Sequence, residues 1–272
     1  MPENDVVQRT PNGPITVRSL ERDLTQLGIG PGMTVLCHTS LSALGWVCGG
    51  PVAVILALER VLAETGTLVM PTHSTQLTDP SQWGAPSVPE AWWPTIRASM
   101  PAFDPELTPT RGMGAIPETF RKQQGVRRSA HPHHSFAAWG AHAERAVAGH
   151  ELDYGLGDAS PLARIHELDA WVLLLGVGHD RSTSLHLAEH RASFPSRRET
   201  RDGAPVRVDG ERQWVEVRCL ATDDSDFATI AQAFDRETGE VRRGRVGNAD
   251  AQLMPQRALV DFAVDWMEAH RD

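Results

Sequence analysis

The chain has 272 residues, of which 40% are hydrophobic and 22% are charged, which is typical of a folded globular protein. Its 26 basic and 35 acidic residues give a net charge of −9, which argues against nucleic-acid binding because phosphate neutralisation needs clustered Lys and Arg. The three cysteines form no Cys-x-x-Cys pair, which argues against a disulfide framework and a structural zinc site. No leader-like start or long apolar stretch is present, so we expect a cytoplasmic protein without membrane spans.

The first elements form a strand–helix–strand pattern. Apolar periodicity predicts a helix from Thr16 to Gly28, and the apolar run Met33–Cys37 predicts a buried strand. Pro51 opens a second predicted helix that ends at Gly66, and Thr67–Met70 is a second buried strand. This order is typical of a βαβ unit and predicts a parallel core sheet.

The middle of the chain is dominated by a long segment rich in Pro and Trp. Residues 72–112 show little periodicity, which favours a functional lid or substrate wall, with a short helix around Trp92–Met100. Further short helices are predicted at 117–124, 141–150 and 161–168. Ala170–Leu175 is the clearest strand, and Thr183 is the predicted N-cap of the helix that follows it.

The last third of the chain predicts a β-hairpin and two helices. Pro205–Val208 and Trp214–Leu220 flank Asp209-Gly210, a pair that supplies the positive φ angles of a tight turn. Helices are predicted at Asp224–Phe234 and Gln256–His270. We therefore expect one α/β domain over residues 1–272, with three layers, a largely parallel or mixed central sheet, and a C-terminal hairpin and helices.

His186 and Glu189 are the first candidate catalytic residues. Residues three apart on a helix lie side by side, and this pair follows the carboxyl end of the strand Ala170–Leu175, where ligands bind in open α/β sheets. A carboxylate fixes the tautomer of a histidine and stabilises its protonated form, as a general base requires. An ordinary surface ion pair explains the spacing equally well.

A second candidate region is the histidine-rich segment His131-Pro-His-His-Ser135. Pro132 predicts an extended chain in which His131 and His133 point one way and His134 the other, which disfavours a metal site. We expect instead a loop at the edge of a pocket, with Arg128 and Ser129 as phosphate contacts.

The third candidate region is Cys37-His38-Thr39-Ser40, where a buried strand enters a glycine-rich loop. Backbone N–H groups and hydroxyls there could bind an anion at the start of the next helix. Cys37 is a candidate nucleophile, although neighbours in a strand face opposite ways and a small buried side chain is the alternative. The sequence contains no G-x-S-x-G, P-loop or G-x-G-x-x-G motif, so hydrolase, NTPase and dinucleotide-binding functions lack their markers.

Six ordered stretches together resemble the aminoglycoside 3-N-acetyltransferase family. They are His38–Gly45, Gly66–Pro71, Arg128–Pro132, Ser135–Gly140, Leu174–Asp180 and Thr183–Glu189. The resemblance implies an α/β fold distinct from that of the general N-acetyltransferase superfamily. It also implies acetyl-CoA as the donor, no metal, and the 3-amino group of a 2-deoxystreptamine aminoglycoside as the acceptor, and hence antibiotic resistance.

The resemblance also assigns roles to residues. His186 would deprotonate the amine with Glu189 orienting it, and His38, Thr39 and Ser40 would lie near the CoA, with donors there for the developing oxyanion. Ser182 departs from the family pattern, in which we expect Asn. Acidic side chains would bind the other ammonium groups of the substrate, and the candidates are Asp79, Asp180 and Glu189. We expect a monomer or a homodimer.

Three alternatives remain open. The first is a Cys37-dependent ping-pong acyltransferase or thioesterase, and the second is a module that sequesters polyamines or aminoglycosides through acidic loops without catalysis. The third is a member of the same family that acetylates an amine other than an antibiotic. A turnover assay with acetyl-CoA and a panel of amines discriminates between them.

Overall fold

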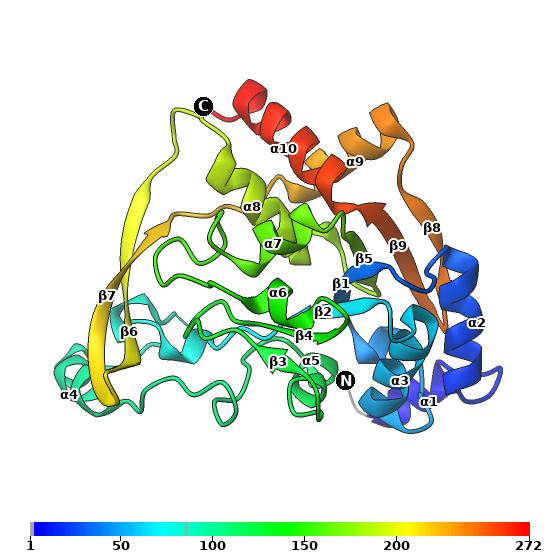
Figure 1. Ribbon diagram of the computed structural model, residues 1–272, viewed down its shortest axis with the longest axis horizontal. Coiled ribbons are helices and arrows are strands. Elements are labelled where there is room, and N and C mark those ends of the chain that lie inside the picture. The colour runs from blue at the N-terminus through cyan, green and yellow to red at the C-terminus, as the bar shows by residue number, and fades with distance from the viewer. Residues whose placement is uncertain (1–2, 85) are drawn as a thin grey trace.

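A computed structural model describes residues 3–84 and 86–272 and is built on a seven-stranded mixed sheet (Figure 1). Along the sheet the strands are β3 (Arg127–Arg128), β4 (Phe136–Gly140), β2 (Thr67–Pro71), β1 (Thr34–Thr39), β5 (Trp171–Leu175), β9 (Ala249–Pro255) and β8 (Arg242–Val246). β1 pairs in parallel with both β2 and β5, whereas β4 and β9 are antiparallel to their inner neighbours. The predicted mixed sheet is confirmed.

The parallel centre comes from the βαβ unit that the sequence predicts. β1 leads into α3 (Gly50–Leu62) and returns as β2, with Thr34 opposite Thr67. The four outer strands, β3, β4, β8 and β9, were not predicted. β8 is largely exposed and carries three arginines in five residues, so its sequence shows no alternation of apolar and polar residues.

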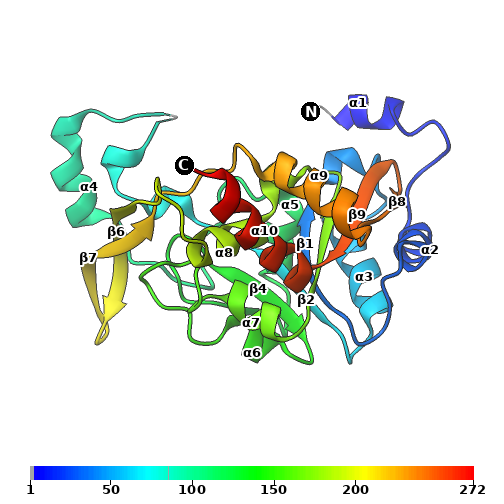
Figure 2. The same cartoon turned by 90° about the horizontal axis from the view of Figure 1, so that it is seen from above.

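Helices cover both faces of the sheet and give the expected three layers (Figures 1 and 2). Successive residues of β1 point to opposite faces: Val35 and Cys37 pack into one core cluster and Leu36 into the other. The first cluster includes α2 (Val17–Leu27), α3 and α5 (Ala115–Phe120). The second includes α6 (Ala143–Val147), α7 (Pro161–Glu167), α8 (Thr183–Arg191), α9 (Phe227–Thr238) and α10 (Gln256–His270).

Some helices begin with a side-chain cap, as α2 does, and others do not, as is the case for α8 near the candidate site. Thr16 caps α2 through a capping box with Ser19, and Gly28 ends the helix with a φ of 102°. α8 begins at Thr183, so Ser182 and not Thr183 occupies the N-cap position, and Ser182 makes no side-chain cap. The helix α1 (Glu3–Gln8) precedes the first element that the sequence predicts, the helix from Thr16 to Gly28.

The predicted hairpin is longer than its sequence pattern indicates. Strands β6 (Glu199–Val208) and β7 (Glu211–Leu220) form a separate two-stranded sheet, with Asp209 and Gly210 at φ values of 51° and 85°. It stands at the far end of the molecule from α2, beside α4 (Trp93–Ser99) (Figure 1). The segment 72–112 packs against this hairpin, with the Phe103 amide donating to the Pro205 carbonyl at 2.9 Å.

In the part of the chain that the structure describes, the remaining elements are five short 3₁₀ turns: η1 (Leu41–Ala43), η2 (Thr75–Leu77), η3 (Pro80–Gln82), η4 (Glu90–Trp92) and η5 (His179–Arg181). Among residues 3–84 and 86–272, no helix combines the length and the apolar character that crossing a bilayer requires.

Candidate active site

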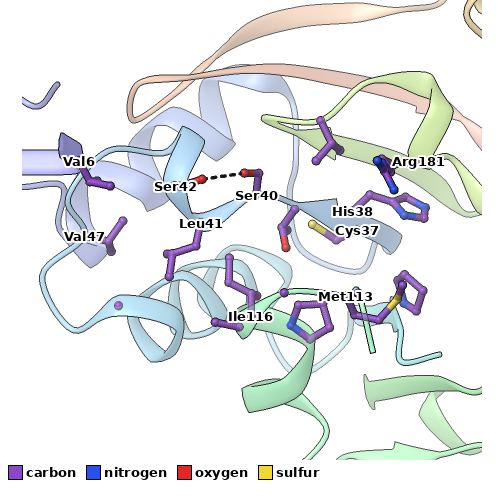
Figure 3. A pocket seen from close by; sticks show the side chains of 18 of the residues that line it. Val6, Cys37, His38, Ser40, Leu41, Ser42, Val47, Met113, Ile116 and Arg181 are labelled. Carbon is purple, nitrogen blue, oxygen red and sulfur yellow. Dashed lines mark hydrogen bonds between the residues drawn. The ribbon is translucent and has the colours of Figure 1, made fainter. Parts of the chain in front are cut away.

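A cavity of about 680 Å³ opens at the carboxyl end of the parallel strands (Figure 3). β1 lies between β2 and β5, so the connections from its two neighbours diverge there and leave a crevice, as in other open α/β sheets. The lining includes Cys37–Ser40 of β1 and its loop, Pro71, Val177, Thr183, residues 112–117, and Glu3 and Val6 of α1. Met113 and Ile116 lie across the cavity from Ser40 (Figure 3).

The wall formed by β1 and the start of α3 carries several polar groups. Thr39 Oγ1 is buried and has no hydrogen-bond partner among the described residues, and Ser40 and Ser42 place their hydroxyls 3.3 Å apart. Gly50, the first residue of α3, lines the cavity, but its N–H donates to the Val47 carbonyl at 2.9 Å, and the next residue, Pro51, has no N–H.

His186 and Glu189 form a dyad in the first turns of α8. Nδ1 of His186 lies 2.6 Å from Oε2 of Glu189. The Glu189 side chain is 1% exposed and the His186 side chain 19%, so the pair is not the ordinary surface ion pair that spacing alone allowed. The His186 ring also contacts Phe227, with 4.9 Å between ring centroids. His186 does not line the large cavity, but Thr183, one turn earlier on α8, does.

Further donors hold the Glu189 carboxylate from its other side. Its Oε1 accepts the backbone N–H of Asp223 at 2.8 Å and Nη1 of Arg271 at 2.7 Å. Burial alone would raise the pKa of Glu189, but the hydrogen bonds from His186, Arg271 and Asp223 lower it below its ordinary value. Glu189 is therefore a buried anion. Sequence reasoning missed Arg271, since no local pattern links it to a residue 82 positions away.

Two neutral histidines, His38 and His73, lie near the dyad. His38 on β1 places Nε2 3.4 Å from the Thr183 hydroxyl, which links the sheet to α8. Burial, with the nearby His186 as a further cause, lowers the pKa of His38 to about 3 and does the same for His73, which follows β2. Both rings are therefore uncharged near neutral pH. His73 was not among the predicted site residues, although its place after a parallel strand is the same signal that selected His38.

Arg128 and Ser129, the predicted phosphate contacts, have their hydrogen-bond partners inside the protein. The Arg128 guanidinium donates to the carbonyls of Thr72, Pro105 and Thr108 and to nearby hydroxyls. All of its N–H groups are therefore engaged inside the protein. The Ser129 hydroxyl is buried between the Phe136 amide and His150. Both residues hold the fold together and neither lines the cavity.

The histidine-rich segment is a turn, not the extended chain that Pro132 suggested. His131 Nδ1 accepts the backbone N–H groups of both His133 and His134 at 3.0 Å, which folds the segment around the imidazole. The segment does not line the cavity. Within residues 3–84 and 86–272, no group of three or more His, Cys, Asp or Glu side chains is arranged to hold a metal ion.

The three acidic candidates occupy different environments. Asp79 pairs with Arg97 at 2.8 Å beside a second cavity of about 480 Å³, between the segment 72–112 and the hairpin. Asp180 is exposed and pairs with its neighbour Arg181. Neither lines the large cavity. Glu189 is buried and held by internal donors at both oxygens.

Cys37 lines the cavity wall as a fully buried side chain of the core. Burial raises the pKa of its thiol well above the ordinary range. Because the thiolate is the nucleophilic form, this environment disfavours the Cys37-dependent alternative.

Comparison with known proteins assigns the chain to a family. A model of the aminoglycoside 3-N-acetyltransferase family matches residues 36–268. The prophage-derived aminoglycoside N(3')-acetyltransferase-like protein YokD of Bacillus subtilis is 47% identical over 93% of this chain and 92% of its own length. Aminoglycoside N(3)-acetyltransferase VII of Streptomyces paromomycinus is 41% identical over 94% of this chain and 93% of its own.

Solved structures agree with this assignment and with the expected fold. The YokD crystal structure has a TM-score of 0.95 at 45% identity and covers 98% of both chains. A structure titled AAC-IIIb binary with CoASH has a TM-score of 0.84 at 32% identity, covering 94% of this chain and 97% of that one. AAC-VIa bound to sisomicin has a TM-score of 0.85 at 33% identity, covering 94% and 98%. The chain thus belongs to the aminoglycoside 3-N-acetyltransferase family of acetyl-transferring enzymes.

Proposed function

We propose that this enzyme transfers the acetyl group of acetyl-CoA to the 3-amino group of 2-deoxystreptamine aminoglycosides, with His186 as the general base and Glu189 as its orienting carboxylate. The observation that carries the proposal is the 2.6 Å contact between His186 Nδ1 and a buried anionic Glu189, next to the cavity at the carboxyl end of the sheet. Modification of this amine would confer antibiotic resistance.

The dyad has the chemistry that amine acetylation needs. An ammonium group has no lone pair, so it must lose a proton before or during attack on a thioester. Because an anionic Glu189 can only accept, the proton between the two side chains resides on Nδ1 of His186, which leaves the Nε2 lone pair free to take the proton of the amine. Direct transfer between two bound substrates then needs no covalent enzyme intermediate.

The large cavity suits the donor substrate. Its volume of about 680 Å³ lies within the range of small-molecule sites. Thr39 and Ser40 offer hydroxyls to the carbonyl oxygen of a bound thioester. The neighbouring structure with CoASH supports this choice of ligand, and the structure with sisomicin supports an aminoglycoside acceptor. The net charge of −9 favours a polycationic acceptor by long-range attraction.

The proposal is tested by acetyl-CoA turnover across an aminoglycoside panel, with NMR of the product to locate the acetyl group. We expect His186→Ala to lower kcat by a factor of about 10² or more, because the base is lost, while CoA still binds. His142→Ala is the matched control, since His142 is exposed and outside the site, and it should retain wild-type turnover. A His186→Ala enzyme that keeps more than about a tenth of the wild-type rate contradicts the assignment.

The alternatives give different results in the same assay. A Cys37-dependent enzyme would form an acetylated Cys37 visible by mass spectrometry and would lose activity as Cys37→Ala, whereas we expect the Cys37→Ala variant to stay active. Binding without turnover would identify a sequestering protein. Turnover with other amines but with no aminoglycoside would identify a family member with a non-antibiotic acceptor.

A further inference from the structure

Arg271 connects the dyad to the loop that precedes α9. It directly follows α10, and its guanidinium contacts three groups beyond that helix. Nη1 donates to Glu189 Oε1 at 2.7 Å, while Nε and Nη2 form a two-pronged contact with Asp226 at 2.8 and 2.7 Å. Nη2 also donates to the Asp223 carbonyl at 2.8 Å. Asp223 in turn donates its backbone N–H to the same Glu189 oxygen.

This network is largely removed from water. The exposed fractions of the side chains are 1% for Glu189, 10% for Arg271 and 24% for Asp226. Burying a carboxylate is costly unless a cation and hydrogen bonds compensate it, and removing one partner of such a group leaves an uncompensated charge. Arg271 is the cation that contacts Glu189 at the oxygen opposite His186.

The two oxygens of Glu189 have separate tasks. Oε1 is fixed by Arg271 and the Asp223 amide, so the carboxylate cannot rotate about its terminal bond without breaking both contacts. That leaves Oε2 in place for Nδ1 of His186. A planar guanidinium anchored on Asp226 is a rigid support, because its donors form a fixed fork.

We propose that Arg271 is a positioning residue for acetyl transfer, which acts by holding the Glu189 carboxylate in the orientation that fixes the tautomer of His186. The inference rests on the proposed function of the dyad and extends it to a residue from the segment after α10. Arg271 acts through Glu189 and contacts neither the cavity lining nor His186 in the described structure.

The test compares Arg271→Gln and Arg271→Lys with the wild-type enzyme in the acetyl-CoA turnover assay. We expect Arg271→Gln to lower kcat at least about tenfold while KM for acetyl-CoA changes by less than about twofold, because a misplaced base affects chemistry more than binding. Arg271→Lys should recover part of the loss, since lysine keeps the charge but not the fork. Added guanidinium ion should raise the rate of Arg271→Ala, which a purely structural defect would not allow.

Arg257→Gln is the matched control, because Arg257 also pairs with a carboxylate, Asp169, but sits at the exposed start of α10. It should leave kcat unchanged. If Arg271→Gln fails to fold by circular dichroism, the Arg271→Lys and Asp226→Asn variants decide: a lowered kcat at constant KM supports the positioning role, and wild-type kcat in both overturns it.

The outcomes separate the two proposals. If wild-type enzyme acetylates, His186→Ala does not, and a folded Arg271→Gln variant keeps wild-type kcat, the positioning role is wrong while the proposed function stands. If His186→Ala remains active, the proposed function itself fails, and the role of Arg271 fails with it.

Discussion

At the scale of single residues, the Glu189 carboxylate is the most constrained group of the candidate site. It accepts contacts from His186, Arg271 and the Asp223 amide, and its side chain is 1% exposed. Three donors around a buried carboxylate keep it anionic despite the cost of burial. A carboxylate held in this way can orient an imidazole and stabilise it once protonated.

Replacing Glu189 by Gln tests that role. The amide keeps the shape of the side chain but brings no charge, and its NH₂ group must face either His186 or Arg271, both of which need an acceptor. We expect kcat to fall by a factor of about 10² or more, measured by steady-state acetyl-CoA turnover. Glu167→Gln is the control, because Glu167 forms only half-exposed ion pairs with Arg145 and Arg164. Wild-type kcat in Glu189→Gln would show that the dyad is not the catalytic unit.

At the scale of secondary-structure elements, α1 has an unusual position for a helix that buries no residue. It lies apart from the layered body of the molecule, near the N-terminus (Figure 2), yet Glu3 and Val6 line the large cavity. Its attachment includes a Trp46 indole N–H donated to Glu3 and a Trp46 amide donated to Thr10. The helix α1 therefore forms part of the cavity wall but buries no side chain in the hydrophobic core.

Deletion of residues 3–8 should consequently affect ligand binding more than stability. We expect KM for acetyl-CoA to rise by up to about tenfold, which corresponds to about 1.4 kcal/mol of lost binding free energy. The melting temperature should stay within about 3 °C, because no buried side chain is removed. The measurement is steady-state kinetics with varied acetyl-CoA beside thermal unfolding. An unchanged KM would place the CoA site away from this wall.

At the scale of the whole molecule, buried and half-buried histidines connect the sheet to the loops around it. His73 follows β2, His131 and His134 lie in the turn before β4, and His150 follows α6. Their rings pack together, with centroids 4.6 Å apart for His131 and His150 and 5.3 Å apart for His73 and His134. Burial lowers the pKa of His73 to about 3 and that of His150 to about 4.

From the lowered pKa values in this cluster we expect the folded protein to lose stability in mild acid. Below pH about 6.5 the unfolded chain binds protons on His73 and His150, while the folded chain does not until pH about 3 to 4. Burial lowers the pKa of His131 and His134 in the same direction. The free energy of unfolding is therefore highest above pH 6.5. It decreases as the pH falls, by up to about 1.4 kcal/mol per pH unit for each histidine with such a lowered pKa.

The measurement is the melting temperature by circular dichroism between pH 7.5 and 5.0. Carboxylates with a lowered pKa, such as Asp79, lose their contribution only below about pH 4, which is below this window. Burial raises the pKa of Glu59, and this carboxyl acts with the opposite sign, because its protonation favours the folded state as the pH falls. A His142→Ala variant should follow the same curve as wild type, since His142 is exposed. A melting temperature that stays constant from pH 7 to 5 would contradict the prediction.

Local chemistry in the sequence was sufficient for the elements that depend on neighbouring residues. The βαβ unit around α3, the tight turn at Asp209-Gly210, the span Gln256–His270 and the adjacency of His186 and Glu189 all follow from periodicity, turn preferences or i, i+3 spacing. The ordered family motifs also identified the family correctly.

Only the tertiary structure decided which partners these residues meet. The sequence predicts a phosphate contact at Arg128, whereas in the structure its guanidinium donates to carbonyls inside the protein. No sequence pattern pointed to Arg271, which binds Glu189 from the segment after α10. Sequence spacing specifies which side chains share a helix face, whereas burial and long-range pairing depend on how helices and strands pack. The sequence by itself thus determined that His186 and Glu189 lie side by side on one helix. The packing of helices and strands determined that Glu189 is buried, anionic and held by Arg271.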